Sequence, residues 1–120
     1  MKKLSDAPVW REATITTADA TPVALLTIPT TSDTSILVKM FLSAVHTTGG
    51  AWAALAAFTA AFNNDGGVLS RVRYISELYD EADAAYDVEI EDSGTNILVN
   101  VTGKAATGIR WKTKTLIVVT

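Results

Sequence analysis

The stretch GGAWAALAAFTAAFNNDGG, residues 49–67, decides the fold class of this chain. Alanine is the best helix former and gives a pleated sheet little to pack, so composition alone favours a helix. As a helix, the run places on one stripe Trp52, Leu55, Ala56, Thr59 and Phe62. As a strand, it directs to one face Trp52, Ala54, Ala56, Phe58, Ala60 and Phe62. Periodicity therefore allows both structures.

The flanking residues favour the strand. Residues 63–67, NNDGG, supply the positive-φ positions of a tight hairpin and lead directly into residues 68–72, VLSRV. We therefore predict a strand, with a helix as the alternative. The opposite face of that strand would carry a row of alanines, a smooth surface that a neighbouring chain could approach closely: Ala51, Ala53, Ala57 and Ala61.

The rest of the chain reads as strands separated by short turns. Apolar and polar residues alternate, and threonine, valine and isoleucine are frequent. Seven further strands are expected within residues 13–17, 22–28, 36–44, 68–74, 86–91, 97–101 and 109–119. Short strands at this spacing predict an all-β protein, an antiparallel jelly-roll-like β-sandwich of about eight strands. We expect one domain over residues 12–120, preceded by an extended N-terminal arm over residues 1–11.

Composition excludes several classes of function. Hydrophobic residues make up 48% of the 120 residues and charged residues 19%, with a net charge of −3 and no cysteine. The net negative charge does not attract nucleic acid or anionic membranes. No apolar stretch has the length of a membrane span or of the core of a secretory signal. We expect synthesis in the cytoplasm, and other subunits covering part of the apolar surface.

Catalytic and metal-binding patterns are weak. His46 is the only histidine, so a serine triad would have to use it with a residue such as Ser43, and no nucleophile motif accompanies them. Asp80, Glu81 and Asp83 could hold calcium, but they lack the alternating ligands and central glycine of a calcium loop, which favours a solvated acidic turn. We predict that the chain is not an enzyme and binds no metal or cofactor.

Two rows of charge are candidate interface residues. At strand spacing, one row consists of Asp87, Glu89 and Glu91, and the other of Arg110, Lys112 and Lys114. They could pair across adjacent strands or form two separate wet faces. Alternatively, they could set the register between subunits or between this protein and a larger assembly.

The three tryptophans are large anchors for a small domain. Trp52 and Trp111 lie on alternating apolar faces, and we expect both in the core. Trp10 precedes the first expected strand. It belongs either to a loosely packed terminus or to an arm whose Val9 and Trp10 fill a pocket on a neighbour.

Three stretches resemble a β-sandwich module of tailed-bacteriophage virion proteins. They are TITTADATPVALLTIP (14–29), AAFNNDGGVLS (60–70) and DAAYDVEIEDSGTNILVNVTGKAATGIRWKTKTLIVV (83–119), and the resemblance extends over residues 12–119. It implies a jelly-roll-like domain that usually works as a homotrimer. The function expected from it is a capsid decoration (cement) protein, located on the capsid surface of the virion, that bridges subunits of the major capsid protein.

The alternative within the same resemblance is a tail- or head-fibre module that binds a host surface polysaccharide. Sugar binding needs exposed aromatic rings beside carboxylates. The residues that could supply them are Tyr74, Tyr79 and Tyr86 with Asp80 and Asp83.

Overall fold

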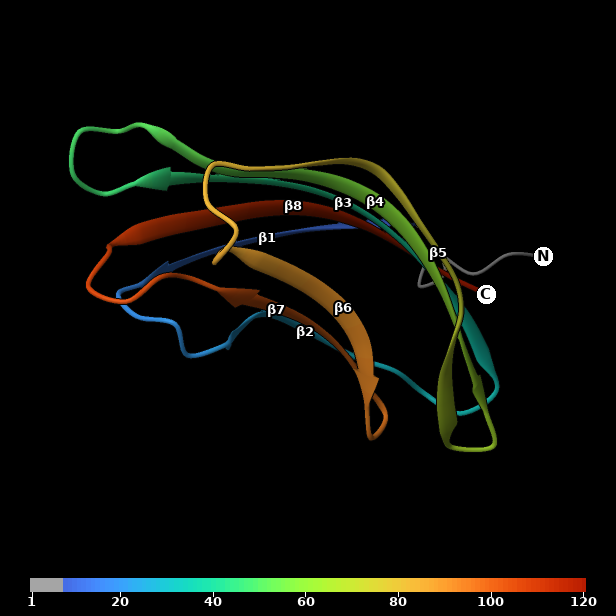
Figure 1. Ribbon diagram of the computed structural model, residues 1–120. Helices are drawn as coiled ribbons and strands as arrows, with labels where there is room; N and C mark the ends of the chain where they lie inside the picture. Colours follow the sequence, from blue (N-terminus) through green and yellow to red (C-terminus); the bar gives the residue numbers. More distant parts are fainter. Residues whose placement is uncertain (1–7) are drawn as a thin grey trace.

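Eight antiparallel strands form two stacked sheets in the computed structural model, which describes residues 8–120 (Figure 1). The larger sheet has the order β1 (Val9–Thr17), β8 (Ile109–Val119), β3 (Thr34–His46), β4 (Trp52–Asp65), β5 (Val68–Glu81). The smaller sheet has the order β2 (Val23–Pro29), β7 (Asn96–Thr102), β6 (Asp87–Ser93). This confirms the all-β sandwich. Strands β3, β4 and β5 follow one another within one sheet, and the jelly-roll detail is not confirmed.

The alanine-rich stretch forms β4, as its flanking turn predicts. Partners bond both of its edges, β3 on one side and β5 on the other. At its end, Gly66 and Gly67 have φ angles of 60° and 95°, and the Gly67 N–H donates to Asn64 Oδ1 at 2.8 Å. Pairing with a strand on each edge gives the backbone of the run hydrogen-bond partners on both sides, so tertiary context overrides alanine's helix propensity.

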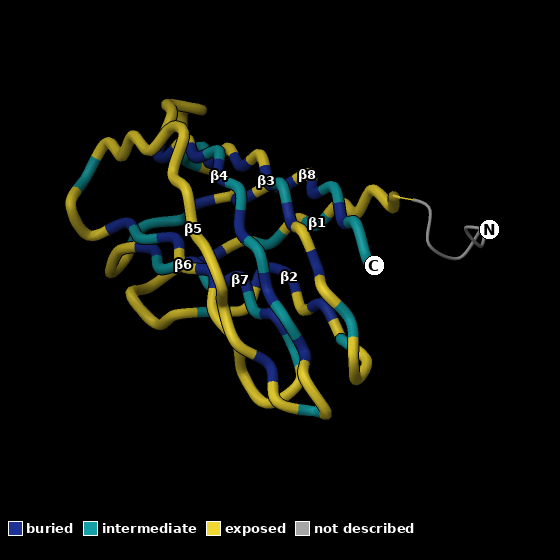
Figure 2. The backbone as a smooth tube through the Cα atoms, turned by 90° about the vertical axis from the view of Figure 1, so that its right-hand side faces the viewer, coloured by how far each residue is buried: buried dark blue, intermediate teal, exposed yellow. Residues whose placement is uncertain are grey.

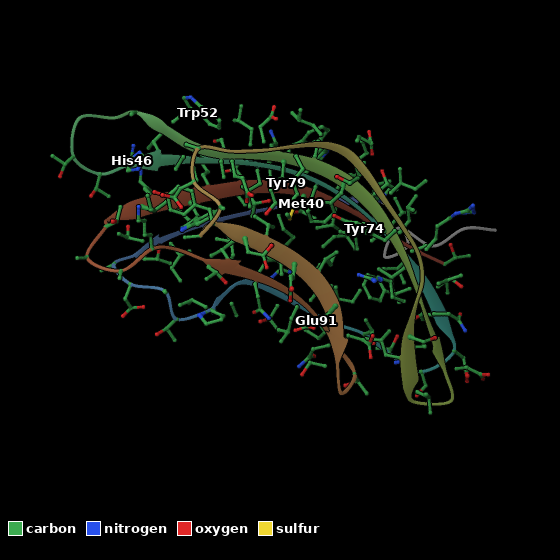
Figure 3. The ribbon with its side chains drawn as sticks, viewed as in Figure 1. Met40, His46, Trp52, Tyr74, Tyr79 and Glu91 are labelled. Carbon is green, nitrogen blue, oxygen red and sulfur yellow. The ribbon has the colours of Figure 1, made fainter. Side chains whose placement is uncertain are left out.

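The core lies between the two sheets and follows the expected alternation. Along β3 and β8 the inward residues are buried and the charged ones point outward. Trp111 is fully buried, and its Nε1–H donates to the buried Thr17 Oγ1 at 2.9 Å. Met40 lies between the layers (Figure 3). The prediction that Trp111 belongs to the core is confirmed.

Trp52 lies outside the core, contrary to expectation. A bulge between Ala44 and Val45 shifts the register there, so that Ala53 and Ala54 are both buried and Trp52 is 49% exposed. Figure 3 shows its ring projecting from the outer side of the larger sheet. One extra residue in a strand reverses the side on which every residue beyond it points.

Two expected boundaries are also wrong. Strand β1 begins at Val9 and pairs with β8, so residues 9–11 belong to the sandwich and not to an arm. Residues 1–7 of that expected arm lie outside the described residues. Strand β5 continues beyond the expected end at residue 74 to Glu81, and so includes part of the expected acidic turn.

Strand β5 is exposed along almost its whole length (Figure 2). It pairs with β4 alone, and two bulges, between Ala57 and Phe58 and between Ala61 and Phe62, interrupt that pairing. The smaller sheet ends at β6 on the same side of the sandwich. This side therefore has two unpaired strand edges facing each other.

Candidate functional site

A groove of about 640 Å³ lies between the edges of β5 and β6. The two sheets do not hydrogen bond to each other as strands here, so the side of the sandwich stays open. Strand β5 contributes Ser70, Arg71 and Tyr74, and strand β6 contributes Val88, Glu89, Ile90, Glu91 and Asp92. An aromatic ring, a cation and three carboxylates thus line one groove.

Arg71 joins the two walls of the groove. Its Nη1 donates to the backbone oxygen of Ile90 at 2.8 Å, and its guanidinium lies 5.2 Å from the centre of the Tyr74 ring. The ring of Tyr74 packs against Phe58 with centroids 5.5 Å apart and remains 38% exposed. Packing on one side and the guanidinium on another hold the aromatic face in place.

The carboxylates lie along the opposite wall. Glu89 and Glu91 alternate with buried Val88 and Ile90, so they project from the outer side of the smaller sheet beside the groove. Asn100 Nδ2 donates to Glu91 Oε1 at 3.1 Å. Figure 3 shows Tyr74 and Glu91 on opposite layers. Because carboxylates accept hydrogen bonds and an aromatic face offers apolar contact, this groove suits a ligand with hydroxyl groups and apolar ring faces.

A second polar cluster surrounds Tyr79, farther along β5. Its hydroxyl is within hydrogen-bond distance of Asp87 Oδ1 at 3.2 Å and of Glu81 Oε2 at 3.3 Å, and it can donate to one of them at a time. Burial, followed by the negative charges of Asp87 and Glu81, raises the pKa of Tyr79. This phenol therefore stays protonated and works as a hydrogen-bond donor.

The two predicted rows of charge do not meet within the chain. Strand β6, which carries Asp87, Glu89 and Glu91, belongs to the smaller sheet, whereas β8, which carries Arg110, Lys112 and Lys114, belongs to the larger one. Both rows point outward from their own sheets. Cross-strand pairing is therefore wrong, and the rows form two separate faces.

Val9 and Trp10 lie on β1, at the free edge of the larger sheet. Both are about half exposed, and Lys114 Nζ lies 5.3 Å from the Trp10 ring centre. Glu12 is 3.9 Å from the same Lys114 nitrogen. Contacts within the larger sheet therefore hold Trp10 and Glu12 of β1 beside Lys114 of β8.

His46 has a structural environment. Its Nδ1 donates to the backbone oxygen of Ala51 at 3.0 Å, which leaves Nε2 to accept from the Tyr86 hydroxyl at 2.9 Å. Tyr86 is only 3% exposed and packs edge-on against Trp111. The prediction that Tyr86 could bind a sugar is therefore wrong, because its side chain is buried. Ser43 is exposed and points away from His46.

The three carboxylates weighed for calcium have separate surroundings. Asp83 Oδ2 binds Lys104 Nζ at 2.6 Å, and its Oδ1 accepts from the Ala85 N–H at 2.9 Å. These two contacts lower the pKa of Asp83. Glu81 contacts Tyr79, and Asp80 is exposed on β5. Within residues 8–120, no three acidic or histidine side chains form a metal-binding group.

Sequence reasoning missed Arg71 and Asp92. Neither has a local motif, and their importance arises only from the approach of β5 to β6. The available signal was the Asn64–Gly67 turn, which sends β5 to the edge of its sheet.

Comparisons with known proteins show a shared fold. No protein-family model and no curated protein sequence matches the chain. The tailspike protein of Acinetobacter baumannii phage AM24 aligns with a TM-score of 0.52 at 11% identity, over 92% of this chain and 26% of that one. Tailspike protein gp49 of Acinetobacter baumannii bacteriophage Fri1 aligns with a TM-score of 0.50 at 14% identity, over 100% of this chain and 21% of that one. This chain thus spans about a quarter or less of each tailspike.

The Fri1 tailspike is described as a capsular polysaccharide depolymerase. That description contradicts the prediction that this chain is not an enzyme. The prediction is wrong in excluding enzymes from the candidate functions, because its basis was the absence of a sequence motif.

Among residues 8–120, no helix is long and apolar enough to cross a membrane.

Proposed function

We propose that this chain is a β-sandwich module of a phage tail component, and that its groove between β5 and β6 binds a host capsular polysaccharide. The observation that carries the proposal is the groove itself, in which the exposed face of Tyr74 lies beside Arg71 and a wall of carboxylates. The fold shared with two tailspikes supports a tail module better than it supports capsid decoration. A virion location follows from this proposal.

The groove is built to bind without large rearrangement. Arg71 links the two sheets through Ile90, and Phe58 supports the ring of Tyr74, so the walls are ordered before a ligand arrives. An apolar sugar face would pack on Tyr74 while hydroxyl groups donate to Glu89 and the other carboxylates. Preorganised side chains reduce the entropy lost on binding.

Several copies of a weak groove would give stronger attachment than one. A polysaccharide repeats its unit, so an assembly of several copies of this chain would engage several units at once. Linked sites raise the effective concentration of each later binding event. The proposed module therefore needs only modest affinity per groove.

Calorimetric titration with a panel of purified bacterial capsular polysaccharides tests the proposal. We expect at least one to bind, and Tyr74→Ala to weaken that binding about tenfold or more, which corresponds to about 1.4 kcal/mol. Val68→Ala, at the 70%-exposed tip of the β4–β5 hairpin, is the matched control and should bind normally. A reducing-end assay on the same mixtures measures cleavage. Absence of binding across the panel, or unchanged binding by Tyr74→Ala, contradicts the proposal.

A further inference from the structure

The outer face of the larger sheet is unusually apolar. Reading the strand register across this face gives rows of neighbouring side chains. One row joins Lys114, Phe41, Ala57 and Leu78, and the row beside it joins Lys112, Ser43, Leu55 and Asp80. Phe41, Leu55 and Leu78 are each 38% to 45% exposed. Contiguous apolar surface of this kind marks interaction sites in soluble proteins.

The alanines of β4 shape this face into two hollows. Ala57 lies between the larger Phe41 and Leu78, and Ala61 lies beside Leu37, near Val72. Shallow grooves occur at both places. A flat apolar sheet does not fix the position of a partner on its surface, whereas hollows beside large side chains fit a complementary surface in one position.

Charge is distributed unequally across the same face. Arg110, Lys112 and Lys114 follow β8 on one side, and Asp80 stands on β5 at the other end of the Lys112 row. In the middle, Lys39 and Glu77 pair at 2.6 Å, so that their charges are already compensated. The second row thus has the cation of Lys112 at one end, the anion of Asp80 at the other, and a serine and a leucine between them.

We infer that this outer face is covered by a second copy of this chain. A copy turned over about an axis parallel to the strands keeps each row and exchanges its ends. Lys112 of one copy then lies toward Asp80 of the other, while Phe41 of one copy enters the hollow over Ala57 of the other, beside its Leu78. The internally paired Lys39 and Glu77 can be covered at lower cost than two free charges. Complementary charge fixes orientation, and apolar contact supplies affinity.

Sedimentation equilibrium of the 120-residue chain over a range of concentrations tests this inference. We expect a mass of more than one chain, and about a 30-fold weaker association for Phe41→Asp, the effect of losing an interface hot spot. Val68→Asp, which places the same charge past the last apolar row, should associate normally. Circular dichroism shows whether each variant is folded. A monomer at all concentrations, or normal association of folded Phe41→Asp, overturns the inference.

A charge exchange gives an independent arm that leaves the apolar side chains in place. Lys112→Asp and Asp80→Lys should each weaken association, and the double variant should restore it. A double variant as weak as the singles overturns the proposed orientation. The inference does not rest on the polysaccharide groove, because Phe41 and Lys112 lie on the other side of the larger sheet. An unmodified chain that is monomeric at all concentrations and still binds polysaccharide would overturn the interface and leave the groove standing.

Discussion

Replacing Arg71 by alanine should loosen the open side of the sandwich. The substitution removes a hydrogen bond from a charged group to the Ile90 carbonyl, 2.8 Å long and partly buried, which contributes about 1 to 1.5 kcal/mol once its solvent exposure is counted. It also removes the guanidinium from the Tyr74 ring, worth about 0.5 to 1 kcal/mol at an exposed site. Together these predict a loss of about 2 kcal/mol in the free energy of unfolding. For a domain of this size, the melting temperature should fall by about 8 °C.

Urea denaturation followed by tryptophan fluorescence measures this loss at a fixed protein concentration. Arg73→Ala is the control, because Arg73 pairs with Ala61 on the outer face of the same strand, away from the groove. We expect its effect to stay within about 0.5 kcal/mol, as for most surface substitutions. Arg71→Lys keeps the charge but loses the planar donor group, so it should lie between the two. Equal losses for Arg71→Ala and Arg73→Ala would refute the proposed link between the sheets.

Three further predictions concern the sandwich itself. Thr17→Val leaves the buried Trp111 Nε1–H without its acceptor and should lower the free energy of unfolding by about 1 to 3 kcal/mol in a denaturant titration, whereas Thr17→Ser should be nearly neutral. Gly103→Ala would place a methyl group 2.5 Å from Thr17 Oγ1 and should cost about 1 to 3 kcal/mol in the same assay, and a neutral result would show that the loop can move aside. The third concerns pH. Hydrogen bonds from Lys39 and Thr59 lower the pKa of Glu77 from its usual 4.5. Its stabilisation is therefore present above pH 4.5 and lost as pH falls through the lowered value. The stability difference between wild type and Glu77→Gln should shrink on acidification, and a difference independent of pH would contradict this assignment.

The sequence predicts the strands well because alternation reports directly on a sheet with one buried face. Along β3 and β8 the period of two identifies inward and outward side chains correctly. The alanine run shows the value of turn chemistry, since residues 63–67 decide a question that the composition of the run leaves open. Local sequence patterns are enough to predict a strand that has a neighbouring strand on each edge and one face buried in the core.

The same reasoning fails where the strand loses its regular pattern. The bulge at Ala44 turns Trp52 to the outer face of the larger sheet, and no residue in that stretch predicts a bulge. Strand β5 is exposed on both faces, so residues 75–81 show no alternation and resemble a loop in sequence. Pairing with β4 through the backbone, which is independent of side-chain type, makes this segment a strand.

The groove could not be predicted because it depends on topology. Alternation places Glu89 and Lys112 on wet faces correctly, but it does not assign their strands to sheets. Arg71 acquires its role only when β5 and β6 become facing edges. A function carried by the approach of two edge strands has no local sequence pattern.

Chemical-shift mapping by NMR, during titration with an oligosaccharide from a capsular polysaccharide that binds, shows whether the groove between β5 and β6 holds the sugar. We expect the largest shifts at Arg71, Tyr74 and residues 88–92, on both walls of the groove. Shifts confined to the outer face around Phe41 and Leu78, or spread without focus over the surface, would contradict this expectation.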